Sequence, residues 1–205
     1  MSMRLNMLFH LAVWICCNFM FIVGMPMGAA AQASALPHPT LVGAELIRGQ
    51  CIRLHDGDSF QFLSSDKKRQ ERIRIYGIDA PEKGMPYATK AREFLAALLK
   101  GKQLQLRVQG YDKYGRILAT VYVEGKDVAL AMINAGYAWH YKQYSNDKTY
   151  AAAERRARQR KRGLWQEAQP LAPWQVRAYR RAGYSDEAFR TLMRKGDPRV
   201  QRFLK

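Results

Sequence analysis

The sequence predicts an α+β fold, mainly β, in which about three helices surround a five-stranded barrel of the OB type. Three observations support this prediction. Five short segments alternate apolar and polar residues, they occur in the order strand-strand-strand-helix-strand-strand, and further helical patterns follow the fifth strand. That order suits a small, partly open barrel of a kind known for binding nucleic acids. The length of 205 residues allows one such domain with extensions.

Residues 1–35 have the three parts of a secretory signal peptide. Arg4 supplies the initial charge, residues 7–23 are almost wholly apolar, and two A-x-A cleavage patterns follow. We predict cleavage after Ala31 or Ala35, with export to a periplasm or out of the cell and no stable membrane anchor afterwards. The alternative is an uncleaved anchor, although the 17 apolar residues are short for a span of about 20.

The mature chain is predicted to have three parts: a linker at residues 36–42, a domain at 43–175 and a basic C-terminal extension at 176–205. The net charge of +17 falls by one, to +16, when the signal peptide with its single arginine is removed. A charge that extreme predicts a polyanion as partner, which can be nucleic acid, an anionic membrane or an acidic polysaccharide. No protein partner is inferred.

The first two strands are predicted on either side of a tight turn. Apolar residues recur from residue 44 to residue 63 and are interrupted by the sequence His55-Asp56-Gly57-Asp58-Ser59. Asp-Gly between two strand-like segments predicts a β-hairpin. Asp56 and Asp58 therefore lie at the turn, where they either only shape it or also serve a site.

The third strand, at residues 72–76, ends just before two carboxylates. Isoleucines alternate there with arginines and a tyrosine, so one face is apolar and the other, which carries Arg74, is cationic. A glycine and a proline after the strand favour a departure from the sheet. Asp79 and Glu82 are therefore predicted on a constrained loop at the strand end.

The remaining elements follow the periodicities of strands and helices. Two more strands are predicted at residues 104–108 and 117–123, joined by a turn rich in charged and aromatic residues at 111–116. An aromatic cluster that includes Tyr141 follows later in the chain. Helices with an apolar stripe or with capping residues are predicted at 86–100, 127–136, 149–162 and 185–195. No chemistry is assigned to residues 166–205.

Acidic and basic groups collect at the predicted strand ends and turns. The candidate metal ligands are all oxygens, without a cysteine pair or paired histidines, which favours Ca²⁺ or Mg²⁺ over zinc. Arginine forks match two phosphate oxygens at a time. A metal, a carboxylate beside it and two arginines can together position a phosphodiester, activate water and stabilise a pentavalent transition state.

Three motifs in this order resemble the staphylococcal-nuclease-like (thermonuclease) family. They are His55 to Ser59, Arg74 to Glu82 and Asp112 to Arg116, with a closing Arg162-Gly163-Leu164-Trp165. The resemblance covers about residues 41–175. It implies the OB barrel with helices, and metal-dependent hydrolysis of DNA and RNA to products with 3′-phosphates.

The resemblance also implies a metal site. Asp58 and Asp79 match the carboxylate ligands of a catalytic Ca²⁺, which is favoured over Mg²⁺, and the main-chain carbonyl of Ala80 matches a third ligand. The family pattern often has threonine at the position of Ala80. Because the ligand is the carbonyl, alanine preserves it and removes only a hydroxyl group.

Further roles follow from the same resemblance. Glu82 matches the general base, and Arg74 and Arg116 match the arginines that bind phosphate and stabilise the transition state. The nucleotide contacts are matched by Lys113, Tyr114 and Tyr141.

Two other classes of protein remain as alternatives. A non-catalytic nucleic-acid-binding module of the same fold would be expected to lack one or more of the five groups assigned to catalysis and metal binding, and here all five are present: Asp58, Arg74, Asp79, Glu82 and Arg116. A protein that binds acidic polysaccharide would account for the charge, but it leaves the clustered acids unexplained.

Overall fold

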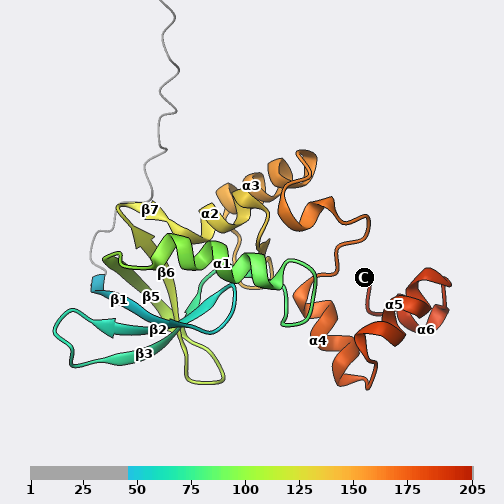
Figure 1. Ribbon diagram of the computed structural model, residues 1–205, viewed down its shortest axis with the longest axis horizontal. Helices are drawn as coiled ribbons and strands as arrows, with labels where there is room; N and C mark the ends of the chain where they lie inside the picture. Colours follow the sequence, from blue (N-terminus) through green and yellow to red (C-terminus); the bar gives the residue numbers. More distant parts are fainter. Residues whose placement is uncertain (1–45, 205) are drawn as a thin grey trace, which may run out of the picture. The chain divides into compact units, whose positions relative to one another are not determined.

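The structure is a computed structural model that describes residues 46–204 (Figure 1). The predicted signal peptide and linker lie outside the described residues. Among these, a six-stranded sheet has the strand order β3-β2-β1-β5-β6-β7. The strands are β1 (Leu46–Leu54), β2 (Ser59–Ser64), β3 (Gln70–Ile75), β5 (Leu104–Tyr111), β6 (Ile117–Val123) and β7 (Lys126–Asp127).

The sheet closes into a barrel because β3 also pairs with β6. This pairing is parallel and places Ile73 opposite Ile117 and Ile75 opposite Ala119. The OB-type fold class is confirmed, but the barrel is closed where a partly open one was predicted. Closure buries both isoleucines of β3, which are at most 1% exposed, and it uses the edge of β3 that an open sheet would leave unpaired.

A second, small sheet holds the segment that follows β3. Strand β4 (Ile78–Asp79) pairs antiparallel with β8 (Trp139–His140), and Asp79 lies opposite Trp139. The sequence predicted only a loop here. This pairing fixes the backbone of Asp79, and so it also fixes the point from which the Asp79 side chain projects.

The described residues contain six α-helices and one 3₁₀ helix, rather than about three helices. Three match predicted helices in the barrel domain: α1 (Ala88–Leu99), α2 (Val128–Ala135) and α3 (Lys148–Gln159). Asp127 caps α2 by accepting a hydrogen bond from the Leu130 N–H, as its position predicted. The others are η1 (Gly163–Gln166), α4 (Pro173–Arg181), α5 (Asp186–Arg194) and α6 (Pro198–Gln201).

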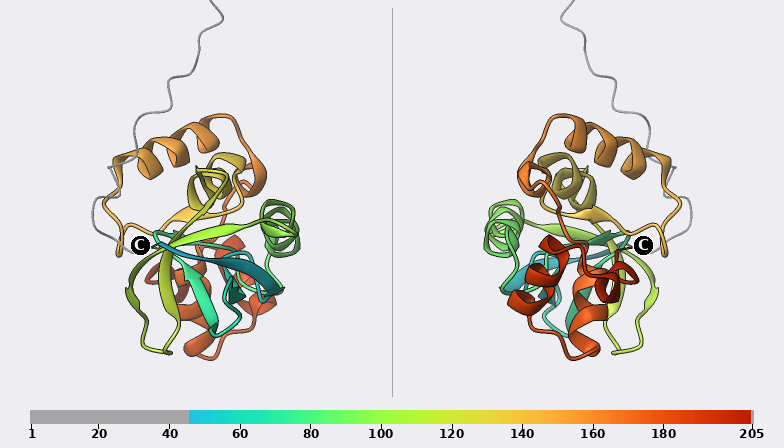
Figure 2. Two further views of the ribbon diagram at one scale, coloured as in Figure 1. Left: turned by 90° about the vertical axis from the view of Figure 1, so that its left-hand side faces the viewer. Right: turned by 90° about the vertical axis from the view of Figure 1, so that its right-hand side faces the viewer.

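The C-terminal helices have a hydrophobic cluster of their own. The main core fills the barrel and the inner faces of α1 to α3. The second cluster joins α4, α5 and α6 and consists of Met85, Val176, Tyr179, Phe189 and Val200. Figures 1 and 2 show these three helices grouped together, separate from α2 and α3. Within residues 46–204, no helix is long and apolar enough to cross a membrane.

Candidate active site

All nine residues predicted from the sequence line one cavity of about 920 Å³. They come from the turn before β2, from β3, from β4 and the segment after it, from the β5–β6 turn and from the chain after β8. The nine are Asp58, Arg74, Asp79, Ala80, Glu82, Lys113, Tyr114, Arg116 and Tyr141. The structure brings them together, while their roles stay predictions.

Asp58 reaches the cavity because its turn packs tightly on the chain after β4. A Cβ atom at Gly57 would lie 2.8 Å from the Ala80 Cβ and 2.9 Å from the Ala91 Cβ, so only glycine fits this contact without movement. The Ala80 N–H then donates a hydrogen bond of 2.6 Å to Asp58 Oδ2. These contacts hold the carboxylate of Asp58 close to Asp79.

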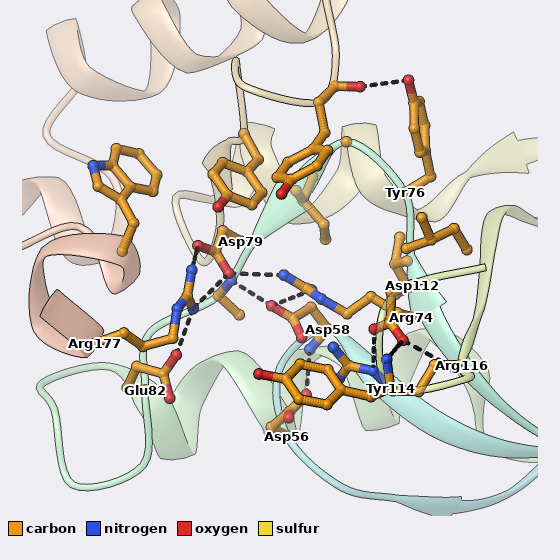
Figure 3. A pocket seen from close by; sticks show the side chains of 18 of the residues that line it. Asp56, Asp58, Arg74, Tyr76, Asp79, Glu82, Asp112, Tyr114, Arg116 and Arg177 are labelled. Atoms are coloured by element: carbon orange, nitrogen blue, oxygen red, sulfur yellow. Dashed lines mark hydrogen bonds and ion pairs between the residues drawn. The ribbon is translucent and has the colours of Figure 1, made fainter. Parts of the chain in front are cut away.

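Arg74 lies between the two aspartates (Figure 3). Its Nη1 is 2.5 Å from Asp58 Oδ2, and its Nη2 donates to Asp79 Oδ1 at 2.7 Å. All three side chains are nearly buried, with the Arg74 side chain 11% exposed. Burial opposes the positive charge of Arg74, but the negative charges of Asp58 and Asp79 outweigh it and raise the arginine pKa. The guanidinium is therefore fixed in place and permanently charged.

The environment of Asp58 acts in two directions. Burial, the largest effect, raises its pKa, and Arg74 opposes this shift. The negative charges of Asp56 and Asp79 raise the Asp58 pKa further. A carboxylate crowded by other acids in a buried place gains most from an added cation, which is the environment that a divalent metal ion would stabilise.

The β5–β6 turn supplies a second arginine from another side of the cavity. Asp112 accepts hydrogen bonds from the backbone N–H groups of Tyr114 and Arg116, and its other oxygen accepts one from Arg116 Nε at 2.6 Å. Lys113 and Arg116 both lie over the Tyr114 ring, which is 72% exposed. The turn thus presents two cations and an open aromatic surface, which suits contact with a nucleotide chain.

Tyr141 is not open in the same way, because a residue of α4 covers it. The rings of Tyr141 and Trp174 lie parallel within 4°, with centroids 5.5 Å apart. Tyr144 contacts Tyr141 edge-on from another side, at 4.8 Å. One face of the predicted nucleotide contact is therefore occupied by the protein itself.

Arg177 is the main residue of the cavity that the sequence reasoning missed. It comes from α4, and Figure 3 shows it between Asp79 and Glu82. Its Nη2 donates to Asp79 Oδ2 at 2.7 Å, and its Nη1 donates to Glu82 Oε1 at 2.6 Å and to Asp79 Oδ1 at 3.2 Å. Burial alone would lower its pKa, but hydrogen bonds with both acids raise it. No local pattern around residue 177 signals this contact, because its partners lie 95 and 98 residues away in the chain.

The oxygen donors fit a hard cation in type, but the two aspartates are paired with arginines. Among residues 46–204, no group of three or more histidine, cysteine, aspartate or glutamate side chains is arranged as a metal site. The predicted set contains only two carboxylates and a main-chain carbonyl, so it would not form such a group. Asp58 and Asp79 do face one guanidinium together, so their oxygens converge on one place. The chemistry of this set suits Ca²⁺ or Mg²⁺.

The structure thus combines a closed OB-type barrel with a cavity in which acids and arginines are paired. Comparison with known proteins identifies the family. The profile of the staphylococcal nuclease homologue family matches residues 72–167. A protein from Escherichia coli named an uncharacterized endonuclease is 40% identical over 129 residues, which is 62% of this chain and 83% of that protein. The chain belongs to the staphylococcal nuclease family.

Other matches share the domain but are longer proteins. The staphylococcal-like nuclease CAN1 of Arabidopsis thaliana is 41% identical over 112 residues, which is 55% of this chain and 35% of CAN1. A probable staphylococcal-like nuclease CAN1 of rice is 39% identical over 115 residues, again with 35% of its length covered. The family profile ends at residue 167, before α4 begins, so Trp174 and Arg177 lie outside the part that the profile matches.

Proposed function

We propose that this chain is an exported, metal-dependent nuclease that hydrolyses phosphodiester bonds of DNA and RNA and leaves 3′-phosphate ends. One observation carries the proposal: a single cavity holds a buried pair of aspartates, a third carboxylate and two arginines at the strand ends of an OB-type barrel. The family membership and the names of the relatives agree with a nuclease. The proposed substrate also agrees with the net charge of +16 after removal of the signal peptide.

Asp58, Asp79 and the carbonyl of Ala80 would hold the metal, with Ca²⁺ favoured over Mg²⁺. A bound Ca²⁺ would supply positive charge next to the scissile phosphate and help to orient it. Asp58 and Asp79 are 6% and 1% exposed, so little water would compete for this charge. The two aspartates would thus bind the metal ion in a buried environment of low dielectric, where the attraction between opposite charges is strong.

The arginines and Glu82 would carry the chemistry. Arg74 approaches the cavity from β3 and Arg116 from the β5–β6 turn. Both would contact non-bridging phosphate oxygens, where charge develops in the pentavalent transition state. Glu82 would take a proton from the attacking water while the bond from phosphorus to the 5′ oxygen breaks. The departing 5′ oxygen takes up a proton from solvent, which leaves the phosphate on the 3′ oxygen and a hydroxyl on the other fragment.

The aromatic and basic groups at the rim would hold the nucleotides on either side of the scissile bond. Lys113 and Tyr114 stand on the exposed β5–β6 turn, and Tyr141 lies beside Asp79 across the cavity. Contacts of this type stack on any base and bind any phosphate, so they fit a substrate range that includes both DNA and RNA.

We further propose that the chain acts in a periplasm or outside the cell. The proposal depends on the signal-peptide pattern of residues 1–35, and on the division into a linker at 36–42, a nuclease domain at 43–175 and a basic extension at 176–205. The helix α4 (Pro173–Arg181) spans the last of these boundaries. Fractionation of cells that produce the full chain, with N-terminal sequencing of the product, would test export and the cleavage point together.

The activity is tested by incubating the purified mature chain with plasmid DNA and with RNA, in Ca²⁺, in Mg²⁺ and in excess chelator. We expect cleavage of both substrates, fastest in Ca²⁺ and absent in chelator, with 3′-phosphates identified by end labelling. Undiminished cleavage in chelator would overturn the metal assignment. Binding without cleavage in every condition would instead indicate the non-catalytic binding module.

A further inference from the structure

Helix α4 brings two side chains into the active site from outside the matched nuclease region. Trp174 and Arg177 are three residues apart, so they project from the same face of the helix. Both line the cavity that contains the predicted catalytic residues. The opposite face carries Val176 and Tyr179, which are at most 1% exposed and belong to the second hydrophobic cluster. The helix is thus held by its own core while it reaches into the site.

Four further hydrogen bonds fix α4 to α5 and to the loop that follows Glu82. Arg180 donates to both carboxylate oxygens of Asp186 at 2.8 and 2.7 Å, and to the Lys83 carbonyl at 3.1 Å. The Tyr179 hydroxyl also donates to Asp186, at 2.8 Å. These bonds tie α4 to α5 and to the chain directly after the predicted general base. The position of Arg177 is therefore built into the fold of the C-terminal helices.

Arg177 uses the same oxygens that a metal ion would need. Asp79 accepts three N–H donors, one from Arg74 and two from Arg177, so both of its oxygens are engaged. Arg177 also occupies one oxygen of Glu82. A cation that binds Asp79 would therefore meet a fixed positive charge within a few ångströms in a nearly buried place, where Coulomb repulsion is strong.

Trp174 covers the face of Tyr141 on which a nucleotide base would stack. Parallel aromatic rings with centroids 5.5 Å apart are already in contact, so a third ring cannot enter between Trp174 and Tyr141. A base could stack on this face of Tyr141 only after Trp174 has moved. The two residues of α4 thus cover the predicted metal ligands and a predicted nucleotide contact together.

We propose that α4 is an inhibitory latch, in which Arg177 competes with the metal ion for Asp79 and Glu82, and Trp174 competes with a base for Tyr141. The proposal rests on the proposed function, because it needs the metal site and the nucleotide site to exist. With the latch closed, the enzyme requires a higher Ca²⁺ concentration and binds nucleic acid less tightly. Release of α4 makes both sites accessible.

The metal half of the latch is tested by calorimetric titration of Ca²⁺ into the mature protein without nucleic acid. Arg177→Gln removes the competing charge, so we expect it to bind Ca²⁺ about tenfold or more tightly than the wild type, within the usual range for coupled sites. Arg181→Gln is the matched control, because it removes the same charge from the same helix and the same cavity, while Arg181 pairs with neither Asp79 nor Glu82. The control is expected to stay close to the wild type.

The base half is tested with a short single-stranded oligonucleotide in chelator, where no cleavage occurs. Trp174→Ala should bind it about fivefold or more tightly, the lower end of the effect of one base stack. Trp174→Phe keeps an aromatic cover and should bind it as the wild type does. Weaker binding by Trp174→Ala would show that Trp174 helps to hold the substrate, which would overturn this half of the latch.

Other outcomes of the calcium titration separate the latch from the proposed function. Equal Ca²⁺ affinity in the wild type and in Arg177→Gln would overturn the latch and leave the calcium site in place. No Ca²⁺ binding by either protein would overturn the calcium site and the latch with it. Unchanged Ca²⁺ affinity with slower cleavage at saturating Ca²⁺ would make Arg177 a third phosphate-binding arginine and would also overturn the latch.

Discussion

The barrel and the α4 helix each supply an arginine to Asp79, but they hold it in different ways. Arg74 comes from β3, which pairs with β2 on one edge and with β6 on the other, and its side chain is 11% exposed. Arg177 comes from a helix anchored by a small separate cluster, and its side chain is 34% exposed. The first arginine is fixed by the main core, while the second can leave if three short helices move. We therefore distinguish a barrel side of the site, where Arg74 stays next to Asp79, from an α4 side, where Arg177 can move away from Asp79.

The largest expected effect concerns the anchor of α4. Phe189 is fully buried and stacks on Tyr179 with ring centroids 4.0 Å apart. Phe189→Ala should cost about 3–5 kcal/mol of local stability, because it empties the centre of the second cluster. Hydrogen exchange measured by mass spectrometry should then show faster exchange in α4 to α6 and unchanged protection in β2, β3 and β6.

The matched control is Phe62→Ala, which removes a similar ring from the barrel core, where Phe62 is 1% exposed. It should lower protection throughout the barrel. If Phe189→Ala lowers protection equally in the barrel and in α4 to α6, the two regions unfold as one unit and the comparison fails.

The next effect concerns the fixed arginines of the barrel side. Lysine keeps the positive charge of Arg74 and Arg116 but lacks the planar fork that contacts two oxygens of the reacting phosphate. Arg74→Lys and Arg116→Lys should each lower turnover by about 10²-fold or more, with a much smaller change in nucleic-acid affinity. Cleavage rates and binding constants should be measured on the same samples, with circular dichroism as a check of folding. Wild-type turnover in both variants would show that neither arginine stabilises the transition state.

The smallest effect concerns acid sensitivity on the barrel side. His140 is 2% exposed in β8, and its backbone pairs with Ile78 next to Asp79. Burial lowers its pKa, so the unfolded chain takes up a proton before the folded chain does. Stability should therefore fall as the pH drops through about 6.5, the ordinary histidine pKa. Between pH 7 and pH 5, the melting temperature of His140→Phe should fall less than that of the wild type. An equal fall in both proteins would count against this explanation.

The barrel side of the site was predictable because its candidate functional residues lie in short sequence motifs. The turn around Asp58 and the strand end before Asp79 can each be recognised from five to ten neighbouring residues, and the resemblance supplied their roles. Their meeting in space follows from the barrel, once the order of the strands is known. The closure through β3 and β6 was less predictable, since parallel pairing of Ile73 with Ile117 leaves no signal in either strand.

The α4 side was not predictable in the same way. Residues 173–204 have basic, amphipathic helical patterns that are typical of a solvated surface, and only the helix at 185–195 was expected. What places Arg177 is the packing of Tyr179 and Phe189 in a separate cluster, together with the Arg180–Asp186 pair. These contacts hold the helix against a loop more than 90 residues earlier in the chain. Such long-range packing depends on the assembled structure and not on any local pattern.

The measurement that tests the central claim most directly is the cleavage rate of Asp79→Asn, compared with its affinity for nucleic acid. Within residues 46–204, Asp79 is the one carboxylate that forms ion pairs with both Arg74 and Arg177, and it is also a predicted metal ligand. Asp66→Asn is the control, since Asp66 carries the same charge on an exposed turn outside the cavity. We expect Asp79→Asn to fold, to bind nucleic acid at least as well as the wild type, and to lose cleavage by about 10²-fold or more. Cleavage by Asp79→Asn at the wild-type rate would contradict the proposed active site.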